Sequence, residues 1–293
     1  LYAPDNTPGN KTLFSKSVAR TLLAKIYAEK PLRDYTKVIQ YCDEVKADGF
    51  DLVDDFSDLF GMNAAGTDAK MRNTKESILE AQFTSGAGNW CTWMFGRDLV
   101  NWNNNFTWAK WVTPSRDLIS AFKQEGDEVR FKESIVYYDC NWSNYYPSDN
   151  YPFMYKCRSA NSSIIKYRYA DVLLLKAEAL IMQDTPDLEG AADIIDKVRD
   201  RAKLGALPTS VRSNKNVLLN ALLKERRLEL AFEGQRWFDL VRLDKVEEVM
   251  NAVYSKDSGR KAQIYTFDKN SYRLPIPQSV IDANDKIHQN PGY

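Results

Sequence analysis

The sequence has few of the residues on which common catalytic and metal sites depend. Its 293 residues include one histidine, His288, and four cysteines, none of them in a Cys-x-x-Cys pair. One histidine excludes sites built from several imidazoles, such as the helical zinc-protease motif. The cysteine spacing argues against zinc ribbons and thioredoxin-like redox pairs, and it leaves three disulfide pairings or free thiols open. We expect neither a metal nor a cofactor, and we expect His288 to be a packing or surface residue.

Excess charge, long apolar runs and nucleotide-binding motifs are missing too. Forty Lys and Arg residues balance forty Asp and Glu residues, so little electrostatic force draws the chain toward nucleic acid. The apolar runs are shorter than the roughly 18 residues that a membrane helix needs. No phosphate-binding loop and no Gly-x-Ser-x-Gly elbow occur. The stretch Gly86-Ala87-Gly88 has Cys91 where a dinucleotide fingerprint would need its third glycine, so we do not interpret it as one.

Helical periodicity dominates what is present. Apolar stripes at helical spacing predict two helices over residues 15–47 and two more over 168–203, each pair forming a helical hairpin that resembles a tetratricopeptide unit. A further helix is predicted over 217–232, followed by a short one at Trp237–Val241. The tail 272–293 contains three prolines and is expected to run extended over the helical body. The fold class is therefore mostly α.

The region between the hairpins, residues 50–165, shows little periodicity. We expect a strand or buried segment at Ile78–Phe83, a short helix at Ser115–Phe122, and long loops elsewhere. Loops of this length in a globular chain are usually functional or disordered, and the many tryptophans argue against disorder. A second aromatic run, formed by Trp142, Tyr145, Tyr146, Tyr151 and Tyr155, could contact a ligand or pack against the protein, and the prolines within it favour packing on a surface.

One segment in this region combines aromatic and amide side chains. Residues 89–111 contain five tryptophans and five asparagines, with Arg97 among them. An indole face matches the apolar face of a sugar ring, while amide and guanidinium groups can bind its hydroxyls. Packing of the loop or a protein interface would use the same rings. The candidate glycan-binding residues are Trp90, Trp93, Arg97, Asn101, Trp102, Asn103, Asn104 and Trp108.

Two charged stretches are expected to be structural. The acids Asp51, Asp54, Asp55 and Asp58 lack the spacing of a calcium loop and favour a solvated helix start. A denser group of opposite charges runs from Glu225 to Arg242 at helical spacings, which favours a network of ion pairs. Paired carboxylates could also form a glycosidase site, but the helical pattern is not typical of glycosidase folds.

Several of these stretches together resemble the SusD/RagB family, the surface glycan-binding lipoproteins of Bacteroidetes. The resemblance lies in Arg168-Tyr169-Ala170-Asp171-Val172-Leu173-Leu174, Ala177-Glu178-Ala179 and Val198-Arg199-Asp200-Arg201-Ala202. It continues through Glu225–Leu240 and closes with Leu274-Pro275-Ile276-Pro277 and Gln289-Asn290-Pro291-Gly292-Tyr293. Lys203, Asp196 and Asp285 depart from residues that are common in the family.

The resemblance implies an α-α superhelix that supports a loop-rich face. It also implies capture of an oligosaccharide without hydrolysis at the outer membrane, in complex with a SusC-like TonB-dependent transporter. Such proteins begin with a lipid anchor and N-terminal helices that are absent here, so we expect residues 1–293 to be one SusD-like domain without its N-terminal part. The family's variable aromatic loops contact glycan, which favours the 89–111 segment. A peptide-capturing or structural transporter lid and, less favoured, a glycoside hydrolase stay as alternatives.

Overall fold

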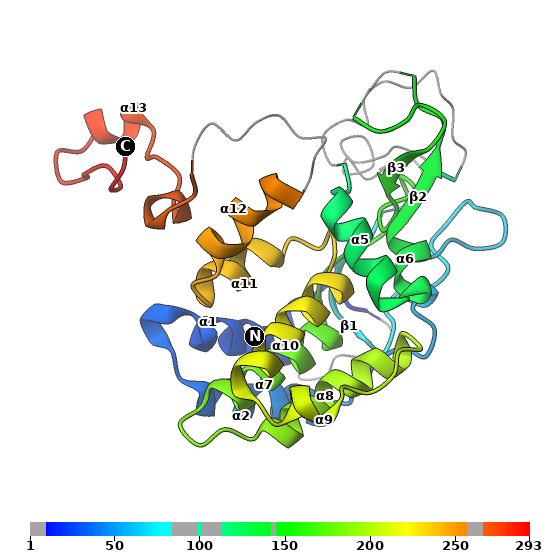
Figure 1. Cartoon of the computed structure of the whole chain (residues 1–293), viewed down its shortest axis with the longest axis horizontal. Helices are drawn as coiled ribbons and strands as arrows, with labels where there is room; N and C mark the ends of the chain where they lie inside the picture. Colours follow the sequence, from blue (N-terminus) through cyan, green and yellow to red (C-terminus); the bar gives the residue numbers. More distant parts are fainter. Residues whose placement is uncertain (1–9, 84–98, 101–112, 142–144, 257–265) are drawn as a thin grey trace. The chain divides into compact units, whose positions relative to one another are not determined.

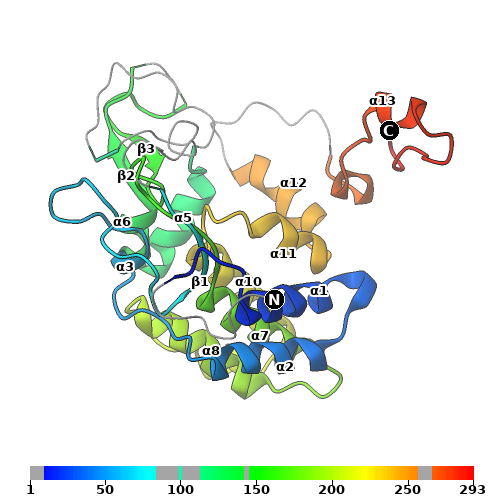
Figure 2. The ribbon, with the colours of Figure 1, turned by 180° about the vertical axis from the view of Figure 1, so that it is seen from behind.

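The computed structural model describes residues 10–83, 99–100, 113–141, 145–256 and 266–293. The chain divides into two compact units, Leu1–Gln235 and Arg236–Tyr293. The first unit holds both hairpins and the region between them, and the second holds the C-terminal elements (Figures 1 and 2).

The first unit is built mainly from helices that pack side by side. Its helices are α1 (Lys16–Ala28), α2 (Tyr35–Ala47), α3 (Ser57–Phe60), α5 (Arg116–Glu125), α6 (Glu128–Ser134), α7 (Tyr169–Met182), α8 (Leu188–Arg201), α9 (Thr209–Arg212) and α10 (Lys215–Glu229), with a 3₁₀ turn η1 (Lys30–Leu32). Helices α1 and α2 form one hairpin, α7 and α8 form the other, and α2 packs against α7. Helix α10 packs on both α7 and α8. The two helical hairpins and the mostly α fold are therefore confirmed.

Local chemistry explains where these helices begin. A side-chain oxygen caps the first turn of α1, α2 and α8, supplied by Ser15, Asp34 and Asp187. Each cap satisfies a backbone N–H that the helix itself leaves without a partner. Helix α7 is central, because every residue in it except Lys176 and Met182 is buried. Such a helix needs packing on all sides, which α2, α8 and α10 provide.

Two small antiparallel sheets lie in the same unit. Strand β1 (Ser77–Ala81) pairs with β4 (Ile164–Arg168), and β2 (Ile135–Tyr138) pairs with β3 (Tyr151–Met154). Strand β1 confirms the segment predicted at Ile78–Phe83, and α5 confirms the short helix predicted at Ser115–Phe122. Helix α6 and the β2–β3 pair replace what the sequence indicated as loop, because a seven-residue helix and four-residue strands are too short to show a period. Both views show β2, β3, α5 and α6 at the end of the unit away from α1 and α2 (Figures 1 and 2).

The second unit contains α11 (Arg236–Arg242), α12 (Val246–Lys256), a 3₁₀ turn η2 (Lys269–Tyr272) and α13 (Gln278–Asp282). Helix α11 confirms the short helix predicted after Gly234. The tail was predicted to be extended throughout, yet it forms α13. Pro277 precedes the first turn of α13, where a helix does not need the N–H that proline lacks.

The last residues of the chain fold back onto residues 273–276. Gln289 accepts a hydrogen bond from the Ile276 N–H (2.8 Å) and donates one to the Ile276 carbonyl (2.9 Å). Asn290 donates to the Leu274 carbonyl at 2.7 Å. Gly292 has φ +96°, and a Cβ there would lie 2.6 Å from the Asn270 Cβ, so only glycine fits. The two terminal motifs of the sequence are therefore two halves of one local structure.

Candidate functional site

The candidate glycan-binding residues lie outside the described residues. This holds for Trp90, Trp93, Arg97, Asn101, Trp102, Asn103, Asn104 and Trp108, and also for Trp142 of the second aromatic run. Within the 84–112 segment the structure describes Leu99 and Val100, and it describes both flanks. The structure therefore shows the residues to which this segment is attached.

The middle of the segment is fixed at Leu99. Its side chain is fully buried, and its N–H donates to the Arg158 carbonyl at 2.8 Å. Its carbonyl accepts a hydrogen bond from the Tyr138 hydroxyl at 2.5 Å. Both backbone groups of Leu99 thus have partners, which burial of this residue requires. Tyr138 is the last residue of β2, so the β2–β3 pair holds the segment at its midpoint.

The C-terminal flank is fixed by tyrosines. The Thr113 hydroxyl lies 2.9 Å from the Tyr151 hydroxyl, and the Tyr146 hydroxyl donates to the Pro114 carbonyl at 2.7 Å. The next residue, Ser115, caps α5 by accepting from the Leu118 N–H. A helix start and two tyrosines therefore determine where the chain leaves the segment.

The N-terminal flank is fixed by one arginine. The Arg72 guanidinium donates to the Phe83 carbonyl at 2.6 Å and to the Asn161 carbonyl at 3.0 Å. It also donates to the Ser163 hydroxyl at 2.9 Å and pairs with Asp68 at 2.5 Å. Because a guanidinium presents five N–H donors in a rigid plane, it can hold several chain segments at once.

An aromatic cluster connects the midpoint and the C-terminal anchor points. Neighbouring ring centroids of Tyr145, Tyr146, Tyr151 and Phe153 lie 4.9–5.7 Å apart in edge-on or tilted geometry. The Arg116 guanidinium lies 4.3 Å from the Tyr145 ring and 4.4 Å from the Tyr146 ring. Such cation–π contacts contribute roughly 0.5–1 kcal/mol at exposed sites and more when desolvated. For the described members of the second aromatic run, the predicted packing role is confirmed. We call Tyr138, Tyr145, Tyr146, Tyr151, Phe153 and Arg116 the aromatic frame.

The sequence indicates half of this frame, the tyrosines Tyr145, Tyr146 and Tyr151 of the second aromatic run. It does not indicate Tyr138, Phe153 and Arg116, since neither an isolated arginine nor an aromatic residue in a four-residue strand carries a pattern. Ser115 is the sequence feature that indicates the C-terminal flank, because a serine before an apolar stripe indicates a helix start.

A buried network of ion pairs joins several elements of the first unit to helix α10. Its centre is Glu229, the last residue of α10, which is completely buried. One carboxylate oxygen of Glu229 accepts from Arg168 at 2.5 Å and from Arg201, and the other accepts from Arg130 at 3.1 Å. The three arginines belong to β4, α8 and α6, so a single carboxylate joins three elements to α10.

Further charged groups complete the network. Glu76 accepts from Arg168 at 2.7 Å and from Arg201 at 2.9 Å. Glu233 accepts from Arg168 at 2.6 Å and from Lys156 at 2.5 Å. Nearly buried charges are tolerated only when they are paired in this way.

The electrostatics of the network follow from burial and pairing. Burial alone would raise the pKa of Glu229, but Arg201, Arg168 and Arg130 outweigh it and hold the pKa well below its usual value. Burial lowers the pKa of Lys156 to about 8, against the opposing effect of Glu233. For Glu225 burial prevails over Arg130 and raises the pKa. The directions of these shifts follow from the balance between burial and pairing at each group.

Ion pairs also join the stretch Arg168–Leu174 to the charged stretch Glu225–Arg242. Asp171 accepts from Arg226 at 2.7 Å and from Lys25 at 2.6 Å. Arg168 binds Glu229, as above. The structural role predicted for the Glu225–Arg242 charges is confirmed, and it includes a pair between Arg242 and Asp239 in the second unit at 2.8 Å.

The acidic stretch at residues 51–58 is also paired. Asp51 binds Lys197, Asp54 binds Lys75, and Asp55 and Asp58 both bind Lys70, at 2.6–3.1 Å. These pairs are largely exposed and are worth about 0–1 kcal/mol each. Within the described part of the chain no group of three His, Cys, Asp or Glu residues could hold a metal ion. No described helix is long and apolar enough to cross a membrane.

Comparison with known proteins places the chain among SusD-like proteins. The family model of the SusD family matches residues 148–293. SusD-like protein P38 of Formosa agariphila is 43% identical over 99 residues, which are 32% of this chain and 19% of that protein. SusD-like protein P2 of the same organism is 36% identical over 143 residues, which are 46% of this chain and 27% of that protein.

Solved structures share the fold. Surface glycan-binding protein A from Bacteroides thetaiotaomicron, solved in complex with laminarihexaose, superposes with a TM-score of 0.75 at 18% identity. The superposition covers 98% of this chain and 66% of that one, so the chain spans less than two thirds of that protein. At this identity the likeness establishes the fold, while the family model and the Formosa proteins establish the relationship. The chain belongs to the SusD/RagB family.

Proposed function

We propose that this protein binds an oligosaccharide without hydrolysing it, through the aromatic and amide side chains of the 89–111 segment. Sugar rings stack on Trp90, Trp93, Trp102 and Trp108, and the hydroxyls are bound by Arg97, Asn101, Asn103 and Asn104. Membership of the SusD family, and a fold shared with a surface glycan-binding protein from Bacteroides thetaiotaomicron that was solved with laminarihexaose, support a glycan ligand. The composition of the segment supports its location.

The observation that carries this proposal is the anchoring of the segment. Its N-terminal flank is attached at Phe83 to Arg72, its midpoint at Leu99 to Arg158 and the aromatic frame, and its C-terminal flank at Thr113–Pro114 to the aromatic frame. Fixing the ends and the middle of a long loop lowers the conformational entropy that remains to be lost when a ligand binds.

Calorimetric titration tests the proposal. The titrants are laminarihexaose and a panel of other oligosaccharides. Trp93→Ala and Trp102→Ala are expected to weaken binding of the best ligand by at least about tenfold, because each removes a stacking surface of about 1.4 kcal/mol or more. Tyr146→Phe keeps the ring but loses the hydrogen bond to Pro114, and is expected to weaken binding by about two- to tenfold.

Phe238→Ala is the matched control, since it removes an aromatic ring that is 60% exposed in the second unit. Its affinity should equal that of the wild type. Unchanged affinity in both tryptophan variants would remove the segment from the site. Release of reducing ends from the bound glycan, abolished by changing one carboxylate, would replace this proposal with a glycosidase.

Delivery of the glycan to a SusC-like TonB-dependent transporter, at the extracellular face of the outer membrane, is the second part of the proposal. Family membership supports it. Copurification of the full-length, lipid-anchored protein with a transporter barrel from solubilised outer membranes is the expected result. Recovery of the protein without any barrel would contradict it.

A further inference from the structure

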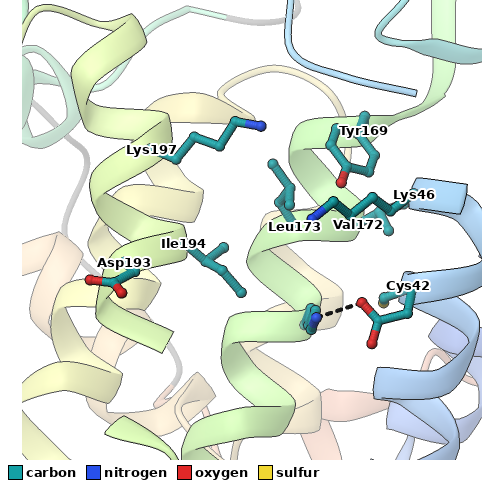
Figure 3. Close-up of a pocket in the computed structure, with 10 residues that line it drawn as sticks. Cys42, Lys46, Tyr169, Val172, Leu173, Asp193, Ile194 and Lys197 are labelled. Atoms are coloured by element: carbon teal, nitrogen blue, oxygen red, sulfur yellow. Dashed lines mark hydrogen bonds and ion pairs between the residues drawn. The ribbon is translucent and has the colours of Figure 1, made fainter. Parts of the chain in front are cut away.

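A small cavity lies where α2, α7 and α8 meet, on residues that the proposed glycan site does not use (Figure 3). Its volume is about 170 Å³, and its apolar lining comes from Cys42, Val172, Leu173 and Ile194. An apolar cavity of roughly 150 Å³ admits a group the size of benzene. Ligand pockets for whole small molecules are larger, roughly 300 Å³ or more. The cavity therefore fits one aliphatic side chain better than a sugar or a cofactor.

The charged side chains at the rim of the cavity are three lysines and two aspartates, and most of them are in ion pairs. Lys176 is paired with Asp43 at 2.5 Å, and Lys197 is paired with Asp51 at 2.6 Å. Asp193, the other acid at the rim, is paired with Arg212 at 2.5 Å. Lys46 makes no ion pair with any described residue.

The polar groups at the rim point over the cavity. Figure 3 shows the Lys46 and Lys197 side chains directed toward each other from α2 and α8, above α7. The Tyr169 hydroxyl is directed into the same space. The Lys197–Asp51 pair is about half exposed on both sides, so it is weak and can exchange partners.

We propose that the cavity and its rim, together called the groove, bind a peptide segment. The peptide inserts one aliphatic side chain into the cavity and presents acidic side chains to the lysines. The apolar floor gives the affinity for the aliphatic group, and Lys46 and Lys197 select for carboxylates beside it. Stacked helical hairpins form concave surfaces of this kind between neighbouring repeats, which suits an elongated ligand. The peptide site is independent of the glycan site.

Fluorescence anisotropy with a labelled peptide, Gly-Glu-Glu-Leu-Glu-Glu-Gly, tests the inference at about 50 mM salt. Saturable binding is expected. The same peptide with glycine in place of leucine should bind at least about tenfold more weakly, because the buried apolar surface is lost. The peptide with lysines in place of its glutamates should not bind.

Three variants separate the contributions of charge and cavity. Lys46→Glu should weaken binding by at least about threefold, and Ile194→Phe should abolish it by filling the cavity. Lys123→Glu is the control for charge, since Lys123 also lies exposed in the last turn of a helix, α5, away from the groove. It should bind like the wild type.

Several results would overturn the inference. These are equal affinity for the leucine and glycine peptides, no binding of the acidic peptide, or equal effects of Lys46→Glu and Lys123→Glu. If Ile194→Phe does not fold, as judged by circular dichroism, the two surface lysine variants still decide the outcome.

Discussion

Replacing Glu229 by glutamine tests the role of the buried ion network. The substitution keeps the volume of the side chain but removes the charge that Arg130, Arg168 and Arg201 share. Breaking a buried pair by removing one partner typically costs 3–5 kcal/mol, because an uncompensated charge stays buried. We therefore expect Glu229→Gln to lower the free energy of unfolding by about 3–5 kcal/mol. The control is Glu189→Gln, whose carboxylate is 72% exposed beside Arg212 and should change stability by less than about 1 kcal/mol.

The measurement is urea unfolding of both variants and the wild type at neutral and acidic pH. The pKa of Glu229 is lower in the folded than in the unfolded state, so its contribution is fully present above the unfolded value of about 4.3. The contribution is lost as the pH falls below that value toward the folded pKa. The difference between wild type and Glu229→Gln should therefore shrink below about pH 4.

A loss below about 1 kcal/mol at neutral pH, equal to that of the Glu189→Gln control, would refute the reasoning. It would mean that the arginines find other partners or water. A large loss that did not change with pH would point to lost packing instead of lost charge.

Two other predictions concern a buried lysine and the C-terminal motif. Burial lowers the pKa of Lys156 from 10.5 to about 8, so the unfolded state binds more protons between these values and stability should rise from about pH 8 to 10.5. Lys156→Met should remove that rise, up to about 3 kcal/mol, in urea unfolding compared at pH 8 and 10; an unchanged rise would contradict it. Gln289→Ala should speed hydrogen exchange at the Ile276 amide by about tenfold, because that N–H loses its acceptor. Gln289→Glu keeps the acceptor and should exchange more slowly than Gln289→Ala, and equal rates would show that the amide is protected by something else.

The long helices could be predicted from the sequence because each carries several turns of one apolar stripe. The stripe of α1 defines a helical period, whereas α7 is long and apolar enough to indicate a buried helix. Helix α6 and strands β2 and β3 could not be predicted, since their lengths of four to seven residues leave a period undefined. Their existence depends on contacts with α5 and with one another, which are set by the fold.

The charges of the network were visible in the sequence, but their partners were not. Glu225 and Glu229 lie on one helix at a spacing that suggested local pairs, whereas their actual partners include Arg130 and Arg168 from distant segments. Sequence gives spacing along one helix and does not tell which elements meet. For the candidate site, composition indicated the 89–111 segment, whose glycan contacts stay a prediction. Two of the tyrosines that anchor it, Tyr146 and Tyr151, belong to the second aromatic run, but their contacts with the segment's flank could be seen only in the structure.

Glycan binding by the tryptophan-rich segment is the central claim, and a glycan array probed with the wild type, Trp102→Ala and Phe238→Ala tests it most directly. The account predicts that the wild type binds at least one class of oligosaccharide, that Phe238→Ala binds it equally, and that Trp102→Ala binds it at least about tenfold more weakly. A wild type that binds no oligosaccharide, or a Trp102→Ala variant that binds as well as the wild type, would contradict it.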